Sequence, residues 1–184
     1  MESPKLFMMM LGCKPEGRHT EQHDVFFSVA NSLTDLKEEI AAFWPNSGKL
    51  HLDAWREVTE VNGYRISIVK KENTITTSKR LFFMNLGGYK PDEFDEFHYK
   101  MLVVANDLAD AIHQAEDTAF YKHVGFAEAP SHVDDKYGVD VDDTFEILDI
   151  LPKKIKDAYD ITIEFVGDLP EDTIHLGYFE LSTI

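Results

Sequence analysis

Eight polar residues form two matching sets, and their types are those of metal ligands and of proton-transfer groups. Each set combines a Glu-x-His pair with a His-x-Asp pair, and the members are Glu21, His23, His51, Asp53, Glu96, His98, His132 and Asp134. Side chains two residues apart on a β-strand point to the same face. If the two strands of a set lie close together, two imidazoles and two carboxylates converge. That inventory suits Zn²⁺ or another borderline divalent ion, and it equally suits a His–carboxylate general base.

A structural role explains the same residues more simply. A His that is hydrogen-bonded to a Glu or an Asp joins two strands, and both sets would be kept because both halves need the same fold. No H-E-x-x-H, Cys-x-x-Cys or Walker pattern is present. Structural pairing, a polar ligand pocket and a metal or catalytic site therefore all stay open. The sequence assigns no catalytic residue, metal or cofactor.

The two sets occupy equivalent places in an internal repeat. Residues 5–44 align without gaps on residues 80–119, and 12 of these 40 pairs are identical. Six further inserted residues extend the alignment over the His-x-Asp pairs at 51–53 and 132–134. Such self-similarity indicates one supersecondary unit that occurs twice.

Hydrophobic patterning predicts the order strand, strand, helix, strand, strand in each copy. The second strands are rich in aromatic and β-branched residues, and Ser32 and Asp107 are good N-cap residues for the helices. Strands are predicted at 6–11, 23–30, 49–58 and 64–69, then at 81–86 and 98–105, with two more within 132–150. Helices are predicted at 33–44 and 108–121, and the tail adds a helix near 152–158 and strands at 161–166 and 174–181.

These elements predict an α+β fold. It consists of two ββαββ repeats, at residues 5–70 and 79–151, followed by a C-terminal β extension at 152–184. Each copy alone is small for a stable core, and no Gly/Ser-rich linker separates the two. We therefore expect the copies to pack with pseudo-twofold symmetry into one body.

Four single residues have structural explanations. Gly12 and Gly87 follow apolar strands but lack the G-x-G-x-x-G and Lys-Ser/Thr patterns of phosphate loops, so we expect turns that need a positive φ. Trp55 is expected to pack in a core or an interface. Cys13 has Gly88 as its counterpart in the second copy, which argues against a catalytic thiol.

The charge of the chain is uneven. Its 34 acidic and 18 basic side chains give a net charge of −16, which opposes binding to nucleic acid or to an anionic membrane. Residues 92–149 hold 16 acidic and 3 basic side chains, a balance of −13, whereas residues 1–91 have a balance of +1. The acidic second copy aids solubility, engages a basic protein partner or forms a cation site.

Cysteine content and hydropathy indicate a cytoplasmic protein. The single Cys excludes an internal disulfide, which fits a reducing compartment. The apolar run at 6–11 is shorter than the roughly 7–15 residues of a signal-peptide core, and no run approaches the roughly 18–20 residues of a membrane span. We expect no membrane partner and no nucleic-acid partner, and formation of a homo-oligomer stays open.

Several segments together resemble one known family. They are LGCKPEGRHTEQHDVFF, KLHLDAWREV, NGYRISI, KRLFFMNLGGY, EFHYKMLVVAND and SHVDDKYGVDVDD. The resemblance, over about residues 5–150, is to the bacterial family catalogued as domain of unknown function 1543, in a two-copy form. That family has no assigned reaction, so the resemblance implies no ligand and no catalytic residue. We expect a non-catalytic interaction protein, and the alternative is a small-molecule or metal-dependent hydrolase or lyase built on the His/Glu/Asp sets.

Overall fold

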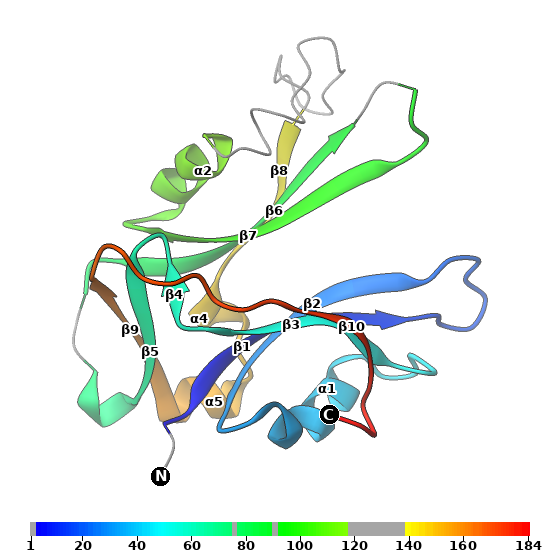
Figure 1. The fold of residues 1–184 in the computed structure, drawn as a ribbon, viewed down its shortest axis with the longest axis horizontal. Helices are drawn as coiled ribbons and strands as arrows, with labels where there is room; N and C mark the ends of the chain where they lie inside the picture. The colour runs from blue at the N-terminus through cyan, green and yellow to red at the C-terminus, as the bar shows by residue number, and fades with distance from the viewer. Residues whose placement is uncertain (1–2, 75–76, 90–91, 118–138) are drawn as a thin grey trace. The chain divides into compact units, whose positions relative to one another are not determined.

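The computed structural model describes residues 3–74, 77–89, 92–117 and 139–184. Strands predominate and the helices are few and short, which confirms the predicted α+β class (Figure 1). The chain forms two compact units: unit 1 comprises residues 1–76 and 151–184, and unit 2 comprises residues 77–150. The C-terminal tail therefore folds with the first unit. None of the described helices is long and apolar enough to cross a membrane.

Unit 1 is built on a four-stranded antiparallel sheet that contains both early and late parts of the chain. Across the sheet, the strands are β10 (His175–Glu180), β3 (His51–Val58), β1 (Lys5–Cys13) and β2 (Gln22–Ala30). Phe7, Met9 and Leu11 alternate along β1 and are buried on one face, as the two-residue period of a strand requires. The intervening residues of β1 face the other side of the sheet, where the first polar set lies.

A short helical segment covers the apolar face of this sheet. The 3₁₀ turn η1 (Leu33–Leu36) leads into α1 (Lys37–Phe43), and Leu36 and Ile40 pack against the β1 core. The backbone amide of Ser32 donates to the Asp35 carboxylate at 3.0 Å, which satisfies a donor that the start of a helix leaves free.

A second, three-stranded sheet of unit 1 joins the tail to the first half of the chain. Its strands, in order, are β4 (Glu60–Val61), β5 (Tyr64–Lys70) and β9 (Tyr159–Phe165). The 3₁₀ turn η2 (Lys71–Asn73) follows β5, and helix α5 (Lys153–Ala158) precedes β9. β9 pairs with β5 along the whole length of both strands. The tail is therefore an integral part of unit 1.

Unit 2 holds a three-stranded sheet with one helix on its apolar face. The strands, in order, are β7 (Glu96–Ala105), β6 (Arg80–Tyr89) and β8 (Val139–Glu146); the helices are α2 (Leu108–Glu116) and α4 (Ile147–Ile150). Met84 and Leu86 of β6 pack against Ala111 and Ala115 of α2. The small alanine side chains let the helix approach the sheet closely.

The central strands of the two units pair with their neighbours in the same way. β1 lies between β2 and β3, and β6 lies between β7 and β8. The β1–β3 ladder shifts its register between Met10 and Leu11, and the β6–β8 ladder shifts between Asn85 and Leu86. Each shift is a β-bulge that adds one residue to β3 in unit 1 and to β8 in unit 2. The predicted pseudo-twofold packing of the copies stays a prediction.

The second copy differs from the prediction in its last two strands. Asp143 lies opposite Asn85 as Ala54 lies opposite Met10, so β8 corresponds to β3 at a displacement of 89 positions rather than 81. The alignment of the two copies was therefore wrong beyond the helix. It matched residues of the same type, whereas strand pairing requires a longer segment between α2 and β8. Residues 147–150, predicted as strand, are helical. The second predicted helix, 108–121, ends earlier, at residue 116.

Candidate functional site

Gly12 lies between the two histidines of the first set. In the sheet, Gly12 of β1 pairs with His23 of β2 on one side and with His51 of β3 on the other. Neighbouring strands are about 4.7–4.9 Å apart, so side chains from β2 and β3 can meet only above a position with no side chain of its own. A Cβ atom on Gly12 would lie 2.6 Å from His51 Nε2.

The expectation of a positive φ at these glycines was therefore wrong. Gly12 and Gly87 lie within β1 and β6 and are not among the described residues with positive φ. The first glycine is required because it leaves room above the middle of the sheet. The pattern of an apolar run closed by Gly does not distinguish a turn from a gap of this kind.

A β-bulge adds the carboxylate of Asp53 to the two imidazoles. Leu11 pairs with Leu52 and Met10 with Ala54, which leaves Asp53 as the extra residue. Bulges commonly redirect a side chain in this way. The Asp53 carboxylate lies above the central strand, where a Cβ atom on Gly12 would come within 2.4 Å of Asp53 Oδ2.

The four residues of the first set form a closed ring of alternating carboxylates and imidazoles. Asp53 Oδ2 lies 3.2 Å from His23 Nε2, and Asp53 Oδ1 lies 3.3 Å from His51 Nε2. On the other side, Glu21 Oε1 lies 3.2 Å from His51 Nε2, and Glu21 Oε2 lies 3.8 Å from His23 Nε2. Each carboxylate is thus close to both imidazoles, so the structure brings all four predicted residues of this set together.

Burial within the ring is uneven. The His51 side chain is 2% exposed, whereas those of His23, Glu21 and Asp53 are 45%, 44% and 31% exposed. The Tyr178 ring of β10 stacks on His51, with ring centroids 4.1 Å apart and planes at 28°. The ring of four therefore has one closed side, at His51, and one side that is open to solvent.

The Nε2 atom of His51 lacks a hydrogen bond among the described residues. His51 Nδ1 lies 3.4 Å from the Lys49 carbonyl oxygen, which only accepts hydrogen bonds. This contact favours a proton on Nδ1 and a lone pair on Nε2. Among the described residues, neither His51 Nε2 nor Asp53 Oδ2 has a hydrogen-bond partner. Pairing by hydrogen bonds therefore does not account for the way in which His51 is buried.

Unit 2 repeats part of this arrangement with a different third residue. His98 Nε2 lies 3.2 Å from Asp142 Oδ2 and 3.9 Å from Glu96 Oε2. Asp142 is the extra residue of the β8 bulge, and a Cβ atom on Gly87 would lie 2.3 Å from its Oδ2. The donor atoms of the three residues all lie within 4.8 Å of one another. Register places Asp140, not a histidine, opposite Gly87.

Sequence reasoning found Glu96 and His98 but missed Asp142. It assigned the remaining places of the second set to His132 and Asp134, which lie outside the described residues. The Val-Asp alternation at 139–142 did correctly indicate a strand. Which of its aspartates reaches His98 depends on a bulge, and a bulge becomes visible only once the strands are paired.

Two further residues near the first set are held by packing. Trp55 stacks on His175 of β10, with centroids 3.9 Å apart and planes at 9°, and its other neighbours include Phe7 and the unit 1 core. Cys13 is fully buried. Burial, and secondarily the charge of Glu21, raises the pKa of the Cys13 thiol.

An ion pair links β10 to the residue whose carbonyl faces His51. Lys49 Nζ lies 2.7 Å from Glu180 Oε1. This hydrogen bond, together with the opposite charges, lowers the pKa of Glu180 and raises the pKa of Lys49. Both side chains are exposed, so the pair contributes little to stability.

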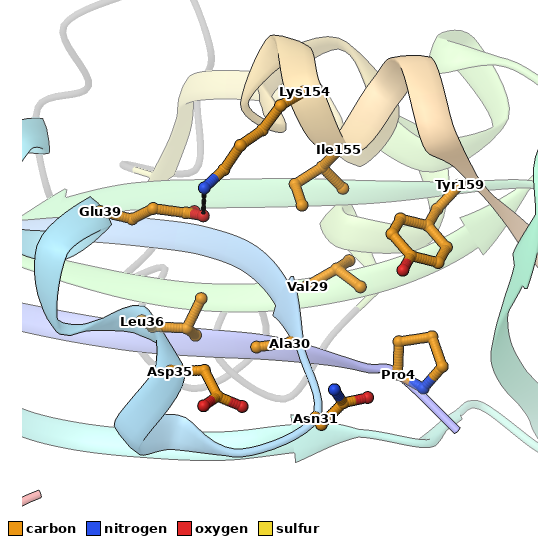
Figure 2. A pocket seen from close by; sticks show the side chains of 10 residues that line it. All are labelled: Pro4, Val29, Ala30, Asn31, Asp35, Leu36, Glu39, Lys154, Ile155 and Tyr159. Atoms are coloured by element: carbon orange, nitrogen blue, oxygen red, sulfur yellow. Dashed lines mark ion pairs between the residues drawn. The ribbon is translucent and has the colours of Figure 1, made fainter. Parts of the chain in front are cut away.

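A separate hollow in unit 1, of about 400 Å³, lies between β2, η1 and α5 (Figure 2). Glu39 and Lys154 form an ion pair within it, and Ser28 Oγ donates to Glu39 at 2.5 Å. The charges of Glu39 and Lys154 therefore satisfy one another, and the Asp35 carboxylate accepts from the Ser32 backbone amide. The ring around Gly12, in contrast, keeps a buried nitrogen without a hydrogen-bond partner.

Comparisons with known proteins concern the family and the fold. Residues 18–68 match the family model described as Domain of Unknown Function (DUF1543), which confirms the resemblance over a range that contains the whole first set. The two-copy form stays a prediction. No curated protein matches the chain.

The structure is similar to the crystal structure of a protein Il1583 from Idiomarina loihiensis. The TM-score is 0.66 at 24% sequence identity, and the match covers 97% of this chain and 98% of that one. At this identity the similarity concerns the fold. It includes the C-terminal tail as well as both units.

Proposed function

We propose that this protein binds a divalent transition-metal ion, with Zn²⁺ as the best fit, through Glu21, His23, His51 and Asp53. One observation carries the proposal: the buried Nε2 atom of His51 has no hydrogen-bond partner among the described residues and faces two carboxylates. A lone pair that faces negative oxygens is unfavourable in a buried site. A cation between these groups turns the same arrangement into four favourable contacts.

The spacing of the donor atoms supports this ion class. Zn²⁺ binds nitrogen and oxygen ligands at about 2.0–2.2 Å in tetrahedral geometry, so its ligand atoms lie about 3.3–3.6 Å apart. The four nitrogen–oxygen separations in the ring, which involve both oxygens of each carboxylate, are 3.2, 3.2, 3.3 and 3.8 Å. Two imidazoles with two carboxylates are a donor set that suits zinc and its neighbours better than Ca²⁺ or Mg²⁺.

The surroundings of His51 are also those of a metal ligand. A histidine that binds a metal through Nε2 usually donates its other ring N–H to a carbonyl or a carboxylate, which fixes the tautomer and the ring. The Lys49 carbonyl occupies that place. The exposure of His23 and Glu21 leaves the opposite side open, so water or a small molecule can reach the ion.

Titration of metal-free protein with Zn²⁺ tests the proposal. After removal of metals by a chelator, we expect calorimetry to show one ion bound in unit 1, with the affinity lowered at least tenfold by His51→Phe. Phenylalanine keeps the aromatic contact with Tyr178 but has no donor atom. His113→Phe is the matched control, because His113 lies exposed on α2 and pairs with Glu116, outside the first set.

The cluster of Glu96, His98 and Asp142 in unit 2 could bind a second ion, so the same two substitutions disable it in every protein that is measured. All variants carry His98→Ala and Asp142→Asn, so a second ion does not obscure the first. Equal Zn²⁺ affinity in His51→Phe and the control, or no Zn²⁺ binding by the parent protein, contradicts the proposal. Unchanged thermal unfolding of the metal-free His51→Phe variant shows that the loss concerns the ion rather than the fold.

The charge of unit 2 favours a second function, the binding of a basic protein partner. Its observation is the balance of −13 over residues 92–149 against +1 over residues 1–91. A high density of acidic side chains attracts a basic partner and speeds its association. Titration with a lysine-rich peptide tests this. We expect binding that weakens steeply from low to physiological salt, and no binding at low salt contradicts it.

A further inference from the structure

We infer that strand β10 completes the ion site of unit 1 and that Tyr178 is its positioning residue, which holds the His51 ring so that Nε2 points at the ion. This inference rests on the proposed function. Tyr178 does not touch the ion; it acts through His51. The tail that supplies it lies outside residues 18–68, the range of the family match.

The first step of the argument is the path of β10. This strand pairs antiparallel with β3, so that Glu180 lies opposite His51 and His175 lies opposite Trp55. Between these points its register shifts, from Leu176 to Phe179. The shift lies beside the bulge of β3 that redirects the carboxylate of the first set. Two adjoining strands are thus irregular at the same place, which is the place of the site.

The second step is the contact between Tyr178 and His51. Its geometry, with centroids 4.1 Å apart and planes at 28°, is that of offset stacking. Tyr178 itself is exposed on its outer side. It therefore covers one face of a histidine that is almost completely buried, and it restricts rotation of that imidazole.

The third step concerns what holds β10 in place around His51. The Lys49–Glu180 ion pair lies at one end, and the stacked pair Trp55–His175 lies at the other. Lys49 also lies over the Tyr178 ring, with Nζ 5.7 Å from the centroid. The residue whose carbonyl faces His51 Nδ1 is thus itself held by β10. The strand supports His51 through both its ring face and its hydrogen-bond acceptor.

The fourth step is the comparison with unit 2. As far as unit 2 is described, its sheet has the order β7-β6-β8, and no strand takes the place that β10 takes beside β3. The same unit has Asp140 at the register position of His51. Unit 1, which has the buried imidazole of His51, thus also has the strand whose tyrosine stacks on that imidazole. This is the relation expected if the strand serves the histidine.

Zn²⁺ binding by variants of Tyr178 tests the inference in the full-length protein that carries His98→Ala and Asp142→Asn. We expect Tyr178→Ala to weaken Zn²⁺ binding at least tenfold and Tyr178→Phe to restore it to within about twofold of the parent. Leu176→Ala is the matched control, because Leu176 is an exposed apolar residue of the same strand. We expect it to bind as the parent does.

Co²⁺ as a probe separates positioning from mere stability. A tetrahedral Co²⁺ site absorbs visible light strongly, so we expect an altered spectrum in Tyr178→Ala at saturating Co²⁺ and the parental spectrum in Tyr178→Phe. Parental Zn²⁺ affinity and Co²⁺ spectrum in Tyr178→Ala overturn this inference and leave the proposed function intact. Absence of Zn²⁺ binding in the parent overturns both. If the alanine variant does not fold, Tyr178→Leu answers the same question, because leucine keeps apolar cover without a ring.

Discussion

At the scale of single residues, the candidate site depends on the absence of a Cβ atom at Gly12. Three side chains from β2 and β3 meet above this residue, and a Cβ atom there would overlap with both His51 and Asp53. Glycine usually weakens a strand, and a close approach of other groups is one reason to keep it. Gly87 has the same relation to Asp142 in unit 2.

We expect the substitution Gly12→Ala to weaken Zn²⁺ binding strongly and to leave the pairing of the strands in the sheet largely intact. The added methyl group would lie 2.4 Å from Asp53 Oδ2 and 2.6 Å from His51 Nε2, so these side chains must move apart. We expect Zn²⁺ affinity to fall at least tenfold by calorimetry, whereas Gly87→Ala should leave the unit 1 site unchanged. If both substitutions lower the Zn²⁺ affinity equally, the effect of Gly12→Ala is not specific to the ion site.

The thiol of Cys13 is expected to be inert in the folded protein. It is fully buried, and burial together with the charge of Glu21 raises its pKa, so the reactive thiolate is scarce near neutral pH. A chromogenic disulfide reagent at pH 8 should react within seconds in 6 M guanidinium chloride and at least tenfold more slowly without it. Fast reaction in buffer alone would contradict this.

At the scale of elements, the start of helix α2 makes unit 2 sensitive to acid. Asp110 accepts hydrogen bonds from the backbone amide of Asn106 at 2.9 Å and from the Gln114 side chain at 3.0 Å, and these lower its pKa. A lowered folded-state pKa stabilises the folded state above the unfolded-state pKa. That contribution disappears as the pH falls through the folded-state value.

Asp110→Asn should therefore reduce the difference in unfolding free energy of unit 2 between pH 7 and pH 3. Urea unfolding at the two pH values measures it. Asp117→Asn, which removes the same charge at the other end of α2, is the control and should keep the parental difference. If both substitutions change the pH dependence equally, the hydrogen bonds of Asp110 are not its cause.

Elements were predictable from the sequence where local pattern decides them. Short apolar runs closed by Gly identified β1 and β6, and β-branched and aromatic residues identified β2 and β7. The last strand of unit 2 was misplaced, because residue types at 132–134 resemble the His-x-Asp pair of unit 1, whereas strand pairing selects Asp142. All four residues of the first set, and Glu96 and His98 of unit 2, followed from spacing. The bulges and the stacking of Tyr178 did not, since each depends on neighbours that are distant in sequence.

At the scale of the whole molecule, unit 1 is discontinuous in sequence. Strand β9 pairs with β5 and strand β10 with β3, so both sheets of unit 1 require the tail. A chain that ends after Ile150 contains both copies of the predicted repeat but leaves the edges of β3 and β5 unpaired. It also lacks β9, the strand that pairs with the buried residues Ile66 and Ile68 in the full chain.

We expect this shortened chain to keep a folded unit 2 and to lose the cooperative unfolding of unit 1. Hydrogen exchange measured by mass spectrometry reports the two units separately. Amides of β1 and β3 should exchange far faster than in the full chain, and those of β6 and β7 should stay protected. If the amides of β1 and β3 are as well protected from exchange as in the full chain, the tail is not needed for the folding of unit 1.

The long separation of β10 from β3 along the sequence has a consequence for how the main sheet of unit 1 is made. During translation the first three strands of the main sheet emerge early, and the strand that completes its edge emerges more than a hundred residues later. At about 5–20 residues per second, the nascent chain waits on the order of ten seconds for that strand. Unit 2 is synthesised entirely within this interval. We therefore expect ion loading to follow the synthesis of β10, because the Tyr178 ring that stacks on His51 is then in place.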